Sequence, residues 1–278
     1  MVTAMYDNHT HSEYSCDIPK GKGSTVREIC EKALSLGLKG VAITDHFDID
    51  GVYDGHFAPL DHKSVMQDVL QAKEDFKGKL KIFHGIELGQ ATHMPVESEE
   101  LLNQYPYDIV LGSIHAVRGI VDFHEIDYSQ MERSVYVGLW SQYIEEMLDT
   151  IKWGKFDVLT HITYPKRYYL RHGITDFPDI KNKGREYFEP VLKAIIEKGI
   201  TLECNSSGLR QPLGECLPNE DLLSFYYELG GREISLGSDS HHCRDIAANF
   251  KEASEMLKTI GFKYQTYFEN RNKNYELL

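Results

Sequence analysis

The chain has 278 residues, of which 41% are hydrophobic and 26% are charged, a composition typical of an ordinary globular protein. Its formal net charge of −13 argues against a partner such as extended nucleic acid, because proteins that track phosphates usually carry a basic face. No apolar run approaches the roughly 20 residues that span a bilayer, so we expect no membrane partner. The five cysteines include no close pair, and the N-terminus lacks the pattern of a signal peptide. We therefore expect a cytoplasmic protein with reduced thiols.

Short apolar runs alternate with longer amphipathic stretches along the chain. The runs predict strands at 3–8, 39–44, 80–87, 108–114, 156–161, 200–205 and 233–238. The stretches predict helices at 25–36, 60–77, 131–152, 183–198, 219–229 and 244–258. Thr25 or Ser24 can cap the first helix, with Glu28 placed for a capping box. Residues 262–278 predict a final edge element and a polar tail.

The repeated order of strand, loop, helix and strand predicts a parallel α/β sheet with right-handed crossovers. An open doubly wound sheet is one solution, and a closed barrel is the other. We favour a single (β/α)7 TIM-like barrel over residues 1–278, because polar residues at six or seven strand ends can converge only around a common axis. The loops 116–130 and 162–182 are long enough to form lids or substrate walls.

Histidines and carboxylates gather where the predicted strands end. His9 and His11 alternate along an extended segment, as do Asp239 and His241, so each pair shares one face. Imidazole and carboxylate are the usual ligands of zinc, iron and manganese. The residues in these positions are His9, His11, His46, Glu87, His115, His161, Asp239 and His241. Their repetition predicts a metal site at the carboxyl ends of the strands.

The combined pattern resembles the polymerase and histidinol phosphatase (PHP) superfamily of metal-dependent phosphoesterases. The matching motifs occur in the family's order, and they are His9-Thr10-His11, Thr44-Asp45-His46, Gly85-Ile86-Glu87, Ser113-Ile114-His115, Thr160-His161 and Gly237-Ser238-Asp239-Ser240-His241. The resemblance implies a distorted (β/α)7 barrel with three divalent metal ions, which can be zinc, iron, manganese or a mixture of these.

The resemblance also implies how the ligands are shared among the three ions. One ion would be held by His9, His11, Glu87 and Asp239, a second by Glu87, His115 and His161, and a third by Asp17, His46 and His241. Many relatives carry histidine where this chain has Asp17. The implied catalytic residues are Glu87, Asp239 and His241, because a hydroxide bridging two ions would attack phosphorus while the third ion neutralises phosphate oxygens.

Two further segments, 160–167 and 202–210, resemble the histidinol-phosphatase branch, with Cys204 as a small departure. Arg167 and Arg210 can grip a phosphate in a bidentate manner, although an arginine in solvent is the ordinary alternative for each. The resemblance thus implies a small phosphorylated substrate, L-histidinol phosphate, hydrolysed in histidine biosynthesis. A PHP phosphoesterase acting on nucleotides, oligonucleotide ends or phosphotyrosine is the alternative, and a metal-binding module without activity is a third. The sequence leaves the oligomeric state open.

Some residues near the motifs can contact the substrate without binding metal. Acidic residues of the 116–130 loop can pair with the ammonium group of histidinol phosphate, namely Asp122, Glu125 and Asp127. Three histidines outside the ligand set can donate a proton to the leaving alkoxide, namely His84, His124 and His242. A solvated loop and a histidine packed in the core are the ordinary alternatives.

Overall fold

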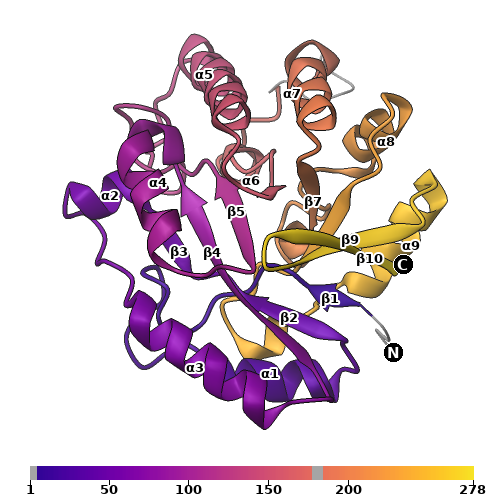
Figure 1. Cartoon of the computed structure of the whole chain (residues 1–278). Helices are drawn as coiled ribbons and strands as arrows, with labels where there is room; N and C mark the ends of the chain where they lie inside the picture. Colours follow the sequence, from indigo (N-terminus) through magenta and orange to yellow (C-terminus); the bar gives the residue numbers. More distant parts are fainter. Residues whose placement is uncertain (1–4, 177–183) are drawn as a thin grey trace.

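The computed structural model describes residues 5–176 and 184–278. In this part of the chain, a parallel sheet runs in the order β1-β2-β4-β5-β6-β7-β8, and the short strand β3 also pairs with β4. The strands are β1 (Tyr6–Asp7), β2 (Gly40–Ile43), β3 (His46–Asp48), β4 (Lys81–Gly89), β5 (Ile109–Ser113), β6 (Val158–Leu159), β7 (Thr201–Asn205) and β8 (Ile234–Gly237). Each overlaps a predicted strand, apart from β3. Figure 1 shows the helices around the outside of these strands.

The sheet closes on itself between its first and last strands. Thr10 and Ser240 form a parallel bridge, and the backbone N–H of His11 donates to the carbonyl of Ser240 at 2.8 Å. Strands β2 and β3 follow one course along β4, since Ile43 pairs with His84 and His46 pairs with Glu87. The described strands therefore form seven positions around an axis. This arrangement confirms the predicted (β/α)7 barrel, and the alternative of an open doubly wound sheet is wrong.

Within residues 5–176 and 184–278, six helices match the predicted stretches, and three others were not predicted. The helices are α1 (Val26–Ser35), α2 (Ile49–Tyr53), α3 (His62–Asp75), α4 (Pro95–Gln104), α5 (Arg133–Trp153), α6 (Lys166–Arg171), α7 (Gly184–Lys198), α8 (Glu220–Glu228) and α9 (Phe250–Ile260), with 3-10 turns η1 (Ala91–His93), η2 (Ser207–Arg210) and η3 (Cys243–Asp245). Helix α1 has the expected capping box between Thr25 and Glu28. Helix α9 begins later than predicted, because η3 precedes it. None of the described helices combines the length and the apolar content that crossing a bilayer requires.

The prediction of a polar tail at 262–278 is wrong. These residues form an antiparallel hairpin of β9 (Tyr264–Glu269) and β10 (Asn272–Leu277), joined by Asn270 and Arg271, which both have positive φ. The hairpin lies at the amino ends of the barrel strands, where Arg271 pairs with Asp157 just before β6. It forms a second apolar cluster with the barrel interior, made of Tyr6, Ala42, Phe83, Ile109, Leu111, Val158, Tyr267 and Phe268. The hairpin thus fills the amino end of the barrel, and Figure 1 shows β9 and β10 crossing over the barrel strands.

Candidate metal centre

The structure brings the nine predicted ligands together at the carboxyl ends of the strands. Four overlapping groups place their ligand atoms within 4.8 Å of one another: His9, His11 and Asp239; His9, Glu87 and His161; His46, Glu87 and His115; and His11, His46 and His241. Asp17 completes the set, with its Oδ2 2.6 Å from Nε2 of His241 and 3.9 Å from Nε2 of His46. These groups can hold metal ions, and their members follow several different strands.

Glu87 lies at the centre of the site, and its carboxylate is fully buried. Its Oε1 lies 2.9 Å from Nε2 of His161 and 3.2 Å from Nε2 of His115. Its Oε2 lies 2.8 Å from Nδ1 of His46 and 3.2 Å from Nε2 of His9. The two oxygens therefore face different pairs of imidazoles, which is the geometry of a carboxylate that bridges two cations.

Several buried polar atoms at this centre make no hydrogen bond. They are Nε2 of His9, Nε2 of His11, Nδ1 of His46 and Oε2 of Glu87. A buried polar atom without a partner costs free energy, so a converging set of such atoms needs an explanation. Divalent cations coordinated by these lone pairs would satisfy them together. The donor set, which mixes imidazole nitrogen and carboxylate oxygen, suits zinc, iron and manganese.

The charges in the site favour the neutral form of His11 and the ionised carboxylates, while the same carboxylates raise the pKa of His9, His46, His115 and His241 above its usual value. Burial first, and then the neighbouring His241 and His46, lower the pKa of His11 to about 3, which keeps its ring neutral. Burial would raise the pKa of Glu87, but His46, His9 and His115 outweigh it and hold the pKa well below its usual range. The pKa of Asp239 is likewise held low by His9 and His11 against the effect of burial. Both carboxylates are therefore ionised near neutral pH.

Two carboxylates behind the ligands orient the imidazoles. Nδ1 of His9 donates to Oε1 of Glu203 at 2.7 Å, and Nδ1 of His115 donates to Oδ1 of Asp48 at 2.8 Å. The other oxygen of Glu203 accepts the backbone N–H of His161 at 2.8 Å. Such bonds fix the ring orientation of a ligating histidine and increase its basicity. The sequence analysis missed Asp48 and Glu203, although an acid within a buried apolar strand such as β7 was a usable signal.

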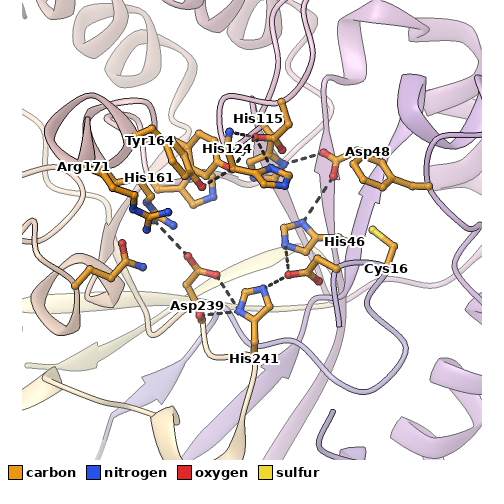
Figure 2. Close-up of a pocket in the computed structure, with 16 residues that line it drawn as sticks. Cys16, His46, Asp48, His115, His124, His161, Tyr164, Arg171, Asp239 and His241 are labelled. Carbon is orange, nitrogen blue, oxygen red and sulfur yellow. Dashed lines mark hydrogen bonds and ion pairs between the residues drawn. The ribbon is translucent and has the colours of Figure 1, made fainter. Parts of the chain in front are cut away.

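A cavity of about 370 Å³ opens above the metal centre, a volume in the usual range for small-ligand sites. Figure 2 shows that its lining includes Asp239 and His241, with Arg171 and Tyr164 on the wall. Arg167 also lines it, with Nη2 3.7 Å from Oδ2 of Asp239, and its buried Nε makes no hydrogen bond. Arg167 is thus a cation next to the metal ligands, at a place where a phosphate can bind.

Arg210 is placed differently. Its Nη2 donates to the backbone carbonyl of Asp239 at 2.9 Å, and it is not among the residues that line the cavity. The side chain therefore supports the loop that carries Asp239. Its role as a phosphate clamp stays a prediction.

The 116–130 loop forms part of the cavity wall. Asp122 and His124 line the cavity, and their contact with a substrate stays a prediction. Glu125 instead pairs with His56 at 3.0 Å, and Asp127 caps an exposed turn at Ser129. Of the other two candidate proton donors, His84 is buried with Nδ1 3.2 Å from the carbonyl of Pro106, and His242 is not in the lining.

Comparisons with known proteins agree with this geometry. A family model described as PHP domain matches residues 7–207. A probable histidinol-phosphatase of Clostridium acetobutylicum is 28% identical over 98% of this chain and 99% of its own length. The histidinol-phosphatase of Lactococcus lactis is 26% identical over 92% of this chain and 91% of its own length. The crystal structure of histidinol phosphate phosphatase from Lactococcus lactis, complexed with zinc, L-histidinol and phosphate, superposes with a TM-score of 0.81 at 23% identity, covering 98% of this chain and all of the other.

Proposed function

The chain belongs to the PHP domain family, and we propose that it is a metal-dependent phosphomonoesterase that hydrolyses L-histidinol phosphate to L-histidinol and phosphate in histidine biosynthesis. The observation that carries the proposal is the convergence of nine imidazoles and carboxylates below a small cavity that also contains Arg167. The relatives named histidinol-phosphatase, which match along nearly the whole chain, support the choice of substrate.

We further propose three divalent ions at this centre. The first would be held by His9, His11, Glu87 and Asp239, the second by Glu87, His115 and His161, and the third by Asp17, His46 and His241. When bound, such ions lower the pKa of water and neutralise charge on a phosphate. Three divalent ions would carry more positive charge than the three carboxylates neutralise, and the six imidazoles are neutral. The loaded site would therefore keep a net positive charge, which suits a phosphate dianion.

The chain's own residues then bind and orient the ester. Arg167 can donate two hydrogen bonds to phosphate oxygens, since its guanidinium is buried at the cavity wall and its Nε is unpaired. Asp122 supplies a carboxylate on the same cavity for the ammonium group of histidinol phosphate. A cavity of about 370 Å³ encloses one small ester better than an oligonucleotide end, which favours this substrate over the polymeric alternatives.

The test is phosphate release from L-histidinol phosphate beside a panel of nucleoside monophosphates and phosphotyrosine, with protein whose metal content has been measured. We expect a strong preference for L-histidinol phosphate, and we expect Glu87→Gln to abolish turnover of every ester. Equal or faster turnover of a nucleoside monophosphate would instead assign the chain to the alternative PHP phosphoesterase activity.

The role of Arg167 has its own experiment. Arg167→Ala should raise KM for L-histidinol phosphate, because it removes a cation from the phosphate position. Arg244→Ala removes an arginine whose side chain is 78% exposed outside the cavity, and it should leave KM unchanged. The same KM in both variants would remove Arg167 from the proposed binding site.

A further inference from the structure

We propose that His124, oriented by Asp122, is the proton donor that protonates the ester oxygen as it leaves phosphorus. The inference rests on the proposed function, since it concerns the hydrolysis of an alkyl phosphate in the same cavity. An alkoxide is a poor leaving group unless it receives a proton in the transition state. None of the proposed metal ligands is needed for this step.

The geometry of His124 is that of an oriented acid. Its Nδ1 lies 3.1 Å from Oδ1 of Asp122, which also accepts the backbone N–H of His124 at 2.9 Å. The hydroxyl of Tyr164 donates to the same oxygen at 3.0 Å. Asp122 is only 11% exposed in its side chain, whereas His124 is 50% exposed. The carboxylate is therefore fixed from several directions, and it holds one end of the imidazole.

The other end of the ring is available to a substrate. Nε2 of His124 lies 3.8 Å from Oε1 of Glu125, which is too long for a hydrogen bond. Both His124 and the ligand His115 line the cavity, so a phosphate ester bound there lies within the same enclosed volume (Figure 2). Since half of the ring is in solvent, water can return the proton after each turnover.

The surroundings raise the pKa of the His124 ring and so favour its charged form. The hydrogen bond that the His124 ring donates to Asp122 is the main cause of the raised pKa of His124, and partial burial opposes it. Glu125 also raises this pKa, and His115 lowers it. The remaining groups that face the pair are Tyr164 and Tyr168, with Arg171 over the ring of Tyr168.

Other protonated groups in the described lining are poorer acids. The pKa of Tyr164 is raised well above its usual value, chiefly by burial, and its hydroxyl already donates to Asp122. Tyr168 donates its proton to Tyr164 at 2.9 Å. Burial raises the pKa of the Cys16 thiol to about 12. Apart from the proposed metal ligands, His124 is therefore the group in the described lining that combines a releasable proton with an unbonded nitrogen.

The proposed hydrolysis conserves atoms and charge. A water oxygen forms a bond to phosphorus while the bond from phosphorus to the ester oxygen breaks, and the electron pair of that bond goes to the ester oxygen. The proton on Nε2 of His124 moves to this oxygen, which leaves as the alcohol of L-histidinol. The attacking water gives up a proton to solvent, and the neutral imidazole of His124 regains one from solvent.

The leaving group distinguishes proton donation from a structural role. The variants His124→Gln and His56→Gln are assayed with L-histidinol phosphate and with p-nitrophenyl phosphate, whose leaving oxygen needs no proton. His56 is the matched control, because it contacts the same Glu125 from outside the cavity. We expect His124→Gln to lower kcat for L-histidinol phosphate by about 10²–10⁴-fold, the usual contribution of a general acid, with little change for p-nitrophenyl phosphate. We expect His56→Gln to change neither.

Equal losses on both substrates, or no loss on either, would overturn the role of His124. If the wild-type protein hydrolyses nucleoside monophosphates in preference to L-histidinol phosphate, the proposed substrate fails, but the leaving-group comparison still decides the role of His124 with an alkyl ester. The two failures are thus distinguishable.

A pH profile gives a second, independent readout. Activity on L-histidinol phosphate should fall at alkaline pH, as His124 loses its proton, and the profile for p-nitrophenyl phosphate should lack this limb. Asp122→Asn should move the limb to lower pH, because the carboxylate that raises the pKa of His124 is gone. The activity of this variant on p-nitrophenyl phosphate shows that it is folded. A limb that stays in place in Asp122→Asn would contradict the proposal.

Discussion

Nδ1 of His9 and Oε1 of Glu203 lie 2.7 Å apart, and both side chains are almost completely buried. This hydrogen bond links the end of β1 to β7 past the intervening strand β8, and the second oxygen of Glu203 accepts the backbone N–H of His161. One carboxylate therefore orients two of the proposed ligands, which lie on different strands. Metal affinity should depend on Glu203 even though it belongs to none of the groups that can hold an ion.

Glu203→Gln tests this dependence, because it keeps the shape of the side chain and removes the charge. We expect metal affinity to fall by about 10–100-fold, the usual effect of losing a partner behind the ligands. The measurement is a metal titration of protein stripped by a chelator. The control is Glu197→Gln, on the exposed surface of α7. Unchanged affinity in Glu203→Gln would mean that the hydrogen bond does not tune the ligand.

Gly237 leaves the space that Glu203 and His9 occupy. A Cβ at this position would lie 2.2 Å from Oε1 of Glu203 and 2.7 Å from Cβ of His9. Gly237→Ala should therefore destabilise the fold by about 1–3 kcal/mol, as overpacking does, and weaken metal binding as well. Gly138→Ala on α5 is the matched change, because no atom lies within 4 Å of the Cβ that this substitution would add. It should stabilise the helix by roughly 0.5–1 kcal/mol, and urea unfolding of both variants checks the opposite signs.

His93 gives the fold a pH dependence that is separate from the metal centre. Burial opposes a charge on its ring, but hydrogen bonds to Asp50 and Glu146, both at 2.5 Å, outweigh burial and raise the pKa to about 9. A raised folded-state pKa contributes stability that is complete below the unfolded pKa of about 6.5 and is lost as pH rises through about 9.

His93→Gln should therefore reduce the loss of stability between neutral and alkaline pH. At neutral pH, the protonated His93 should contribute on the order of 3 kcal/mol to the free energy of unfolding, because folding raises its pKa from about 6.5 to about 9. Urea unfolding at about pH 6 and pH 10 measures it, and His172→Gln on an exposed position is the control. If the wild type and His93→Gln show parallel pH profiles, the pair of carboxylates does not hold a proton on His93.

Phe268 is the most buried apolar residue of the C-terminal hairpin, with 2% of its surface exposed. Phe268→Ala should lower the free energy of unfolding by about 3–5 kcal/mol, because it removes a buried aromatic ring and leaves a cavity. Tyr264→Ala, at a position that is 48% exposed on the same hairpin, should change it by less than about 0.5 kcal/mol. Similar small losses in both would show that the hairpin contributes little to the core.

The strands and the ligand set were predictable because each depends on a short, continuous stretch of sequence. A buried strand such as β5 is a short apolar run, and a ligand such as His115 follows it directly. Helix α4 also carried a readable signal that was missed, with Pro95 at its first position and Glu97 in its first turn. Helix α6 lies inside the segment predicted as a long loop, and its six residues are too few to show a clear period.

Other features depend on contacts that no single stretch of sequence encodes. Asp48 orients His115 because β3 and β5 both flank β4, so their side chains meet only after the sheet has formed. The hairpin at the C-terminus turns at Asn270 and Arg271, where both residues have positive φ. The sequence Asn-Gly is the usual signal for such a turn. Here Arg271 stands where glycine is expected, so the turn could not be recognised from the sequence.

The position of that hairpin has a consequence for the order in which the molecule can be assembled during translation. Tyr267 stacks on Tyr6 with ring centroids 3.9 Å apart, so residues from the two ends of the chain meet in one core. A nascent chain that has already exposed every proposed ligand, up to His241, still lacks the residues that seal the opposite end of the barrel. The ligands can therefore emerge from the ribosome before the framework that holds them is closed, because the hairpin that completes the interior is synthesised after them.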